Sequence, residues 1–236
     1  MSALVLVHGG VHGAWCWDSV APLLEDAGHD VQAVDLPGRG ATAAAAPTVT
    51  LEDWVAAVGA AVDAAPEPPL LVAHSMGGVS CSQFADRRPG DIRGIVYVSA
   101  VVPVDGAAGL PSLQEAGPDC VLLAEGAIVF SADGTTATVP PEHARRAFYE
   151  RCAEADVAAA LERICPEPVA PLMTPLTLGP AFASVAKRYI GATEDRAVPP
   201  AFQRMEAERC GAEYVTIDSD HSPFLSAREA FVALLG

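Results

Sequence analysis

The 236-residue chain carries 30 acidic and 14 basic side chains, so its formal net charge is −16. This excess of negative charge opposes binding to nucleic acids and to anionic membranes, because both are bound mainly through Lys and Arg. Hydrophobic residues make up 51% of the chain, yet no apolar run approaches the roughly 20 residues that span a bilayer. The length suits one α/β domain. We expect a cytoplasmic protein, because no signal peptide precedes the first apolar run.

The six cysteines are scattered along the chain and form neither a CxxC pair nor a Cys/His cluster with zinc spacing. We therefore expect reduced and mostly buried thiols, no metal site and no cofactor. The expected partner is a small-molecule substrate. A homodimer is compatible with the sequence.

Six short runs rich in Val, Ile and Leu alternate with helical patterns, which is typical of βαβ units and a mostly parallel sheet covered on both faces. The runs cover residues 3–7, 31–34, 70–73, 95–99, 185–190 and 214–217. Helices are predicted over residues 16–27, 51–64, 77–87 and 226–235. Gly28, Pro66 and Pro89 follow the first three, as expected for helix ends. The sequence therefore predicts an α/β fold.

The alternation of strands and helices stops between residues 104 and 178. This segment contains a plausible hairpin over residues 127–130 and 135–139, and helical patterns over residues 141–151 and 154–164. Inserted between two strands, it would form a lid over the strand ends, where open α/β sheets bind ligands. We therefore predict a core of residues 1–103 and 179–236 and a lid of residues 104–178 within one domain.

A candidate nucleophile, Ser75, lies where the third predicted strand meets a helix. Residues 70–78 read LLVAHSMGG, which describes a buried strand, a tight turn and a helix start. A strained turn of this kind needs small residues two positions before and after the serine, and Ala73 and Gly77 meet that need. Backbone N–H groups at the helix start stabilise negative charge there. Cys81, further along the helix, is expected to pack as a small apolar side chain.

Two glycines, Gly9 and Gly10, follow the first predicted strand. Glycine lets the backbone approach a ligand closely, and an N–H from such a loop joins the N–H after the nucleophile in an oxyanion hole. We assign Gly10 and Met76 as the two donors. His8 and His12 flank the glycines, and we expect them to hold the loop by hydrogen bonds.

A serine hydroxyl needs a base, and in this architecture an acid and then a histidine follow the serine in the chain. His221 is the one histidine after the last predicted strand, so it is the candidate base. Glu194 and Asp195 compete as the acid after the strand at 185–190. We favour Asp195, because its shorter side chain suits a fixed hydrogen bond to the imidazole, and Asp105 is a third candidate.

Together these motifs resemble the α/β-hydrolase superfamily, and within it the plant methylesterase and hydroxynitrile lyase-like group with its bacterial relatives. The resemblance rests on VHGGVHGAWCW at residues 7–17, DLPG at 35–38, AHSMGG at 73–78, TED at 193–195 with VP at 198–199, and DH at 220–221. It implies an α/β-hydrolase fold with an inserted lid and triad roles for Ser75, Asp195 and His221. It also implies that the N–H groups of Gly10 and Met76 bind the oxyanion.

Two positions separate esterase from lyase chemistry within this group. The lyases carry a Thr where this chain has Gly9, and a Lys where it has Ser222, so the resemblance favours ester hydrolysis. We therefore predict a serine carboxylesterase, of the methylesterase type, that forms an acyl-enzyme on Ser75. Two alternatives stay open: a lyase or cyclase that uses the same triad as acid and base, and a receptor without turnover.

Apolar and aromatic residues of the lid are the candidates for the substrate pocket. Each could equally pack inside the lid. They are Leu122, Leu123, Phe130, Phe148, Tyr149 and Met173.

Overall fold

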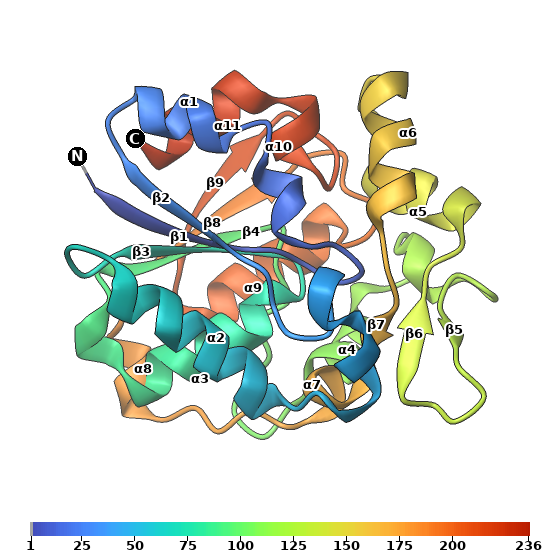
Figure 1. The fold of residues 1–236 in the computed structure, drawn as a ribbon, viewed down its shortest axis with the longest axis horizontal. Helices are drawn as coiled ribbons and strands as arrows, with labels where there is room; N and C mark the ends of the chain where they lie inside the picture. The colour runs from blue at the N-terminus through green and yellow to red at the C-terminus, as the bar shows by residue number, and fades with distance from the viewer. Residues whose placement is uncertain (1) are drawn as a thin grey trace.

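The computed structural model describes residues 2–236 and has a fully parallel six-stranded central sheet (Figure 1). Its strand order is β2-β1-β3-β4-β8-β9, and every neighbouring pair is parallel. The strands are β1 (Ala3–Val7), β2 (Asp30–Val34), β3 (Leu70–His74), β4 (Gly94–Val98), β8 (Lys187–Ala192) and β9 (Glu213–Ile217). All six predicted runs are strands, and the predicted α/β fold is confirmed.

Helices cover both faces of the sheet (Figure 1). On one face lie α1 (Ala21–Asp26), α10 (Pro223–Ser226) and α11 (Arg228–Leu235), and on the other α2 (Leu51–Ala64), α3 (Gly77–Arg87), α8 (Pro180–Ser184) and α9 (Pro200–Cys210). Successive residues of a strand point to opposite faces, so Leu4 and Leu6 of β1 belong to one core cluster and Val5 and Val7 to the other. Three short 3-10 helices lie in the connections of this part of the chain: η1 (Ala14–Trp17), η2 (Gly40–Thr48) and η3 (Pro89–Asp91).

Helices with strong local signals lie where the sequence predicts them. The helix α2 begins at a capping box, in which Thr50 and Asp53 bond each other's backbone N–H. The predicted helix over residues 16–27 is wrong in its first half: η1 and α1 are separate, and Pro22 stands in the first turn of α1. The predicted last helix, over residues 226–235, corresponds to α11, and the short helix α10 before it was not predicted.

Between β4 and β8, residues 104–173 lie at the carboxyl ends of the strands (Figure 1). They form a three-stranded antiparallel sheet from β5 (Val129–Phe130), β6 (Thr136–Thr138) and β7 (Glu167–Pro168). Around it are α4 (Gly109–Ser112), α5 (Pro141–Phe148), α6 (Glu154–Arg163), α7 (Val169–Met173), η4 (Leu113–Ala116) and η5 (Val121–Leu123). The predicted hairpin is confirmed, whereas β7 was not predicted. The domain boundaries at 104 and 178 stay a prediction. In residues 2–236, no helix is both long and apolar enough to cross a bilayer.

A buried carboxyl group beneath the sheet gives the stability of this fold a pH dependence. Glu206 on α9 is 1% exposed and accepts a hydrogen bond from the N–H of Val102, just after β4. Burial raises the pKa of this carboxyl from 4.5 to about 7, against the effect of that hydrogen bond and of Arg209. Between pH 4.5 and about pH 7 the carboxyl group loses its proton in the unfolded chain and keeps it in the folded chain. The free energy of unfolding therefore falls as the pH rises through this range.

We expect Glu206→Gln to stabilise the protein at alkaline pH and to change little near pH 4.5, the ordinary pKa of the group. At about pH 8 its free energy of unfolding should exceed that of the parent by about 2–3 kcal/mol, because each pKa unit corresponds to about 1.4 kcal/mol. Urea unfolding at the two pH values measures this difference. The control is Glu208→Gln, at an exposed position of the same helix. An equal gain at both pH values would contradict the titration.

Candidate active site

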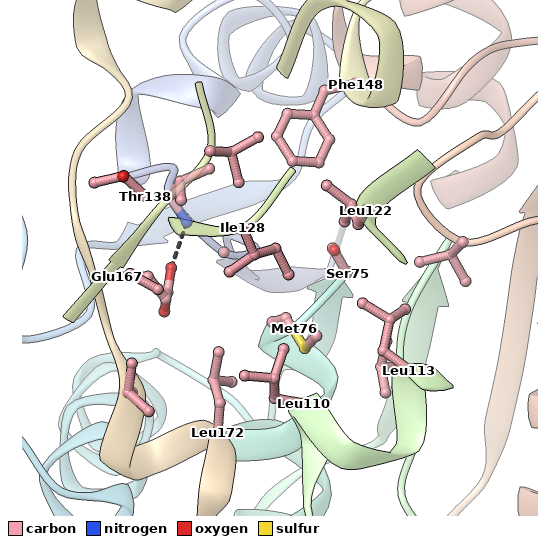
Figure 2. A pocket seen from close by; sticks show the side chains of 17 residues that line it. Ser75, Met76, Leu110, Leu113, Leu122, Ile128, Thr138, Phe148, Glu167 and Leu172 are labelled. Carbon is pink, nitrogen blue, oxygen red and sulfur yellow. Dashed lines mark hydrogen bonds between the residues drawn. The ribbon is translucent and has the colours of Figure 1, made fainter. Parts of the chain in front are cut away.

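Ser75 lies in a strained turn between the end of β3 and the start of α3. Its φ is 52°, a left-handed value that is uncommon for a residue with a Cβ. The N–H of Ser75 donates to the Val98 carbonyl at 3.0 Å, and its own carbonyl accepts from the N–H groups of Gly78 and Val101, both at 3.1 Å. These three bonds hold the turn, and with the turn fixed the side chain of Ser75 lines a cavity (Figure 2).

The glycines around Ser75 are required by close backbone contacts. A Cβ on Gly77 would lie 2.6 Å from the carbonyl oxygen of His8, and a Cβ on Gly9 would lie 2.6 Å from the Cβ of Ser75. Both distances are shorter than van der Waals contact permits. The glycine loop after β1 therefore packs directly against the turn that carries Ser75.

Hydrogen bonds from His8 and His12 hold the glycine loop, as predicted. The N–H of Leu36 donates to His8 Nε2 at 3.1 Å, so His8 Nδ1 carries the proton and donates to the Gly9 carbonyl at 2.8 Å. His12 Nδ1 lies 2.7 Å from the Gly10 carbonyl. Burial lowers the pKa of His12 from 6.5 to about 4 and that of His8 well below 6.5. Both rings are therefore neutral at pH 7 and can fix the loop without adding charge.

The lid reaches this loop through Tyr149, whose hydroxyl lies 2.7 Å from His12 Nε2 and donates to it. Removing the hydroxyl leaves His12 Nε2 as a buried acceptor without a partner, at a cost of about 1–3 kcal/mol. The proton of His12 can then move from Nδ1 to Nε2, and the bond to the Gly10 carbonyl is lost. We expect Tyr149→Phe to lower kcat on a nitrophenyl ester about tenfold. Tyr97→Phe is the control, because Tyr97 is also buried and hydrogen-bonded, to Ser82 at 2.8 Å. Equal kcat values in the two variants would contradict a role for the Tyr149–His12 bond.

The candidate base and acid are paired. His221 Nδ1 lies 2.7 Å from Asp195 Oδ2, and both side chains are almost completely buried. Asp195 Oδ1 accepts from the N–H groups of Ala197 and Val198, both at 2.8 Å. A carboxylate held by two backbone N–H groups keeps its orientation. It can therefore fix the ring of His221 with the proton on Nδ1, which leaves Nε2 free to act as a base.

The two competing carboxylates lie elsewhere. Glu194 is largely exposed and pairs with Arg151 of the lid at 3.3 Å, and Asp105 accepts a hydrogen bond from the N–H of Leu178. Sequence reasoning missed Gln203, whose Nε2 donates to Asp195 Oδ2 at 3.1 Å. Gln203 is on α9, a helix without a clear apolar stripe in the sequence, so no local signal identified it.

The loop of His221 is tied to the residue beside the nucleophile. His74 Nε2 donates to the His221 carbonyl at 2.9 Å, and the two rings are 4.6 Å apart. Asp220, which belongs to the DH motif but had no predicted role, accepts from the N–H of Ser222 at 3.1 Å and the N–H of Arg151 at 2.8 Å. The structure thus brings the loop of His221 and the turn of Ser75 together, and the bond from Arg151 joins the lid to the loop of His221.

Ser75 opens into a mostly apolar cavity of about 60 Å³ under the lid (Figure 2). Gly10 and Met76, the predicted oxyanion donors, line it together with Leu122 and Phe148. The other lining residues are Val11, Val101, Leu110, Leu113, Ile128, Ala137, Thr138, Val139, Glu167, Val169, Leu172 and Val198. Apolar walls with a few polar groups are typical of a site that binds a small molecule.

Two predicted pocket residues lie outside this cavity. Phe130 in β5 is 50% exposed and Met173 at the end of α7 is 48% exposed, and neither lines the cavity around Ser75. Their assignment to the pocket is corrected. A short hairpin or helix has an inner and an outer face, and the composition of the segment does not show which face an apolar residue occupies. Leu123 and Tyr149 also lie outside the lining, the latter because its hydroxyl turns toward His12.

Comparisons with known proteins agree with this geometry. Residues 4–234 match a family model described as "Alpha/beta hydrolase family". Methylesterase 7 of Arabidopsis thaliana is 33% identical, over 98% of this chain and 94% of that protein. Salicylic acid-binding protein 2 of Nicotiana tabacum is 29% identical, with the same coverage of 98% and 94%. The crystal structure of polyneuridine aldehyde esterase is 26% identical, has a TM-score of 0.88, and covers 100% of this chain and 98% of its own.

Proposed function

We infer that this chain, which belongs to the alpha/beta hydrolase family, is a serine hydrolase that cleaves small carboxylic esters through an acyl-enzyme on Ser75. One observation carries the assignment: Ser75, in a left-handed turn with a φ of 52°, opens into an apolar cavity beside the loop of the His221–Asp195 pair. The similarity to plant methylesterases supports the same substrate class.

In the proposed reaction, Ser75 Oγ attacks the ester carbonyl while His221 Nε2 takes its proton. The N–H groups of Gly10 and Met76 stabilise the negative charge that develops on the carbonyl oxygen. His221 then returns the proton to the leaving alkoxide, and water hydrolyses the acyl-enzyme in the same way. Asp195 keeps the His221 ring in the orientation and tautomer that this sequence requires.

The tight contact between the glycine loop and the nucleophile favours hydrolysis over the lyase alternative. The lyases of this group carry a Thr at the position of Gly9, and here a Cβ on Gly9 would lie 2.6 Å from the Cβ of Ser75. Ser222 also lacks the amino group of the lyase Lys. A receptor without turnover would not need the buried pair of His221 and Asp195. A cytoplasmic location and a homodimer stay predictions of the sequence.

The decisive experiment is a panel of short-chain nitrophenyl and methyl esters with intact-protein mass spectrometry. We expect turnover and, at early times, one acyl adduct that peptide mapping places on Ser75. Ser80→Ala, which removes a buried serine from α3, should show the same adduct. Absence of turnover across the panel would exclude esterase activity, and turnover without any adduct would favour acid–base chemistry of the lyase or cyclase kind.

A further inference from the structure

One acidic side chain faces the mostly apolar cavity. Among the described residues that line it, Glu167 of β7 is the one with an ionisable side chain, and it is 4% exposed. Figure 2 shows its carboxylate at the cavity wall, bonded to a backbone nitrogen. A buried carboxylate is costly unless it is paired and hydrogen-bonded. Its partners therefore decide what else it can bind.

The partners of Glu167 lie behind it or beside it and use only part of its capacity. Arg39 Nη2 donates to Glu167 Oε1 at 2.5 Å, and the N–H of Val11 donates to Oε2. Arg39 is 1% exposed and does not line the cavity, so the ion pair presents its negative end to the ligand space. A carboxylate has about four lone-pair sites, and two of them are occupied here.

This negative end lies close to the reacting atoms. A Cβ on Gly10 would lie 3.3 Å from Glu167 Oε2, and the N–H of Gly10 is a proposed donor to the oxyanion. A group that bonds to Glu167 must therefore be only a few bonds away from the ester carbonyl. In apolar surroundings such a hydrogen bond or charge contact is stronger than it is in water.

We propose that Glu167 is a specificity-determining residue, which selects esters that carry a hydroxyl or ammonium group a few bonds from the carbonyl and rejects esters with a carboxylate there. The donor group bonds to the free lone pairs of Glu167, whereas a carboxylate meets a like charge in a desolvated site. The proposal rests on the esterase function, because it places the selected group relative to the carbonyl that Ser75 attacks.

Matched esters test this selection: methyl butanoate and its hydroxyl-, ammonium- and carboxylate-bearing analogues. In the parent, kcat/KM should be about tenfold or more higher for the hydroxyl and ammonium esters than for methyl butanoate, and lower by a similar factor for the carboxylate ester. In the Glu167→Gln protein, the kcat/KM values of the substituted esters relative to methyl butanoate should approach one. This variant should still hydrolyse methyl butanoate. Glu162→Gln, an exposed position of α6, should keep the parent's ratios. The same ratios in the Glu167→Gln and parent proteins, or a parent that does not discriminate, would overturn the proposal.

Two further measurements separate the possible failures. If Glu167→Gln does not fold because Arg39 is left unpaired, the double variant Arg39→Gln/Glu167→Gln replaces the ion pair by two neutral amides and should give the compressed ratios. Calorimetric binding of the same esters to Ser75→Ala compares Kd values without turnover. A parent that hydrolyses none of the esters would refute the esterase function, and the Kd ratios would still decide the role of Glu167.

Discussion

Replacement of Ser75 by alanine is expected to lower kcat for ester hydrolysis by about 10⁶-fold. The hydroxyl supplies the atom that forms the acyl-enzyme, and no other side chain of the cavity lining offers a nucleophile activated by the His221–Asp195 pair. Alanine keeps the Cβ, so the turn with its φ of 52° and the hydrogen bonds of its backbone remain. Stopped-flow release of nitrophenol should show no burst, and steady release should be about 10⁶-fold slower than in the parent.

Ser99 provides a matched control for this variant. It also follows a parallel strand, has a left-handed φ of 47° and is completely buried, but it does not line the cavity. Ser99→Ala should therefore keep kcat within a few-fold of the parent, with equal far-UV circular dichroism for both variants. A Ser75→Ala protein that retains a tenth of the parent's kcat would refute Ser75 as the nucleophile.

The parts of the site that sequence reasoning identified are those with local signals. The turn of Ser75 needs small residues at fixed offsets, and the structure shows why: the Cβ of any larger residue at Gly77 would meet the carbonyl oxygen of His8 at 2.6 Å. Chain order pointed to His221 and Asp195 as candidates, because the carboxyl ends of parallel strands lie at one edge of the sheet, and the structure pairs the two side chains. The helices α2 and α3 were predicted over their observed ranges for the same local reasons.

The parts that sequence reasoning missed depend on contacts between distant residues. Arg39 and Glu167 are 128 positions apart, and each alone looks like an ordinary surface charge in the sequence. The helix α9 was not predicted, because the side chains on its buried face include Gln203 and Glu206, and these polar residues obscure the apolar periodicity. Only the folded structure shows that Gln203 bonds to Asp195 and that Glu206 bonds to the backbone just after β4.

Asp195→Asn is expected to lower kcat by about 10⁴-fold while substrate binding changes little. The backbone N–H groups of Ala197 and Val198 can only donate. Gln203 can turn its amide oxygen and His221 can change tautomer, so the new amide NH₂ faces His221 Nδ1. Nδ1 then becomes an acceptor and the proton moves to Nε2, the nitrogen that has to take the proton of Ser75. The ring stays in place in the wrong tautomer, and this separates the effect from a loss of structure.

Glu194→Gln is the control for this substitution, because it makes the same chemical change at the neighbouring position. Its side chain is 61% exposed and contacts Arg151 rather than His221, so we expect kcat within a few-fold of the parent. The histidine ¹⁵N shifts of the two variants report the tautomer of His221 directly. A large loss of kcat in Glu194→Gln with near-parent kcat in Asp195→Asn would reverse the assignment of the acid. Comparable losses in both variants would mean that the loop as a whole, rather than the Asp195 carboxylate, orients the base.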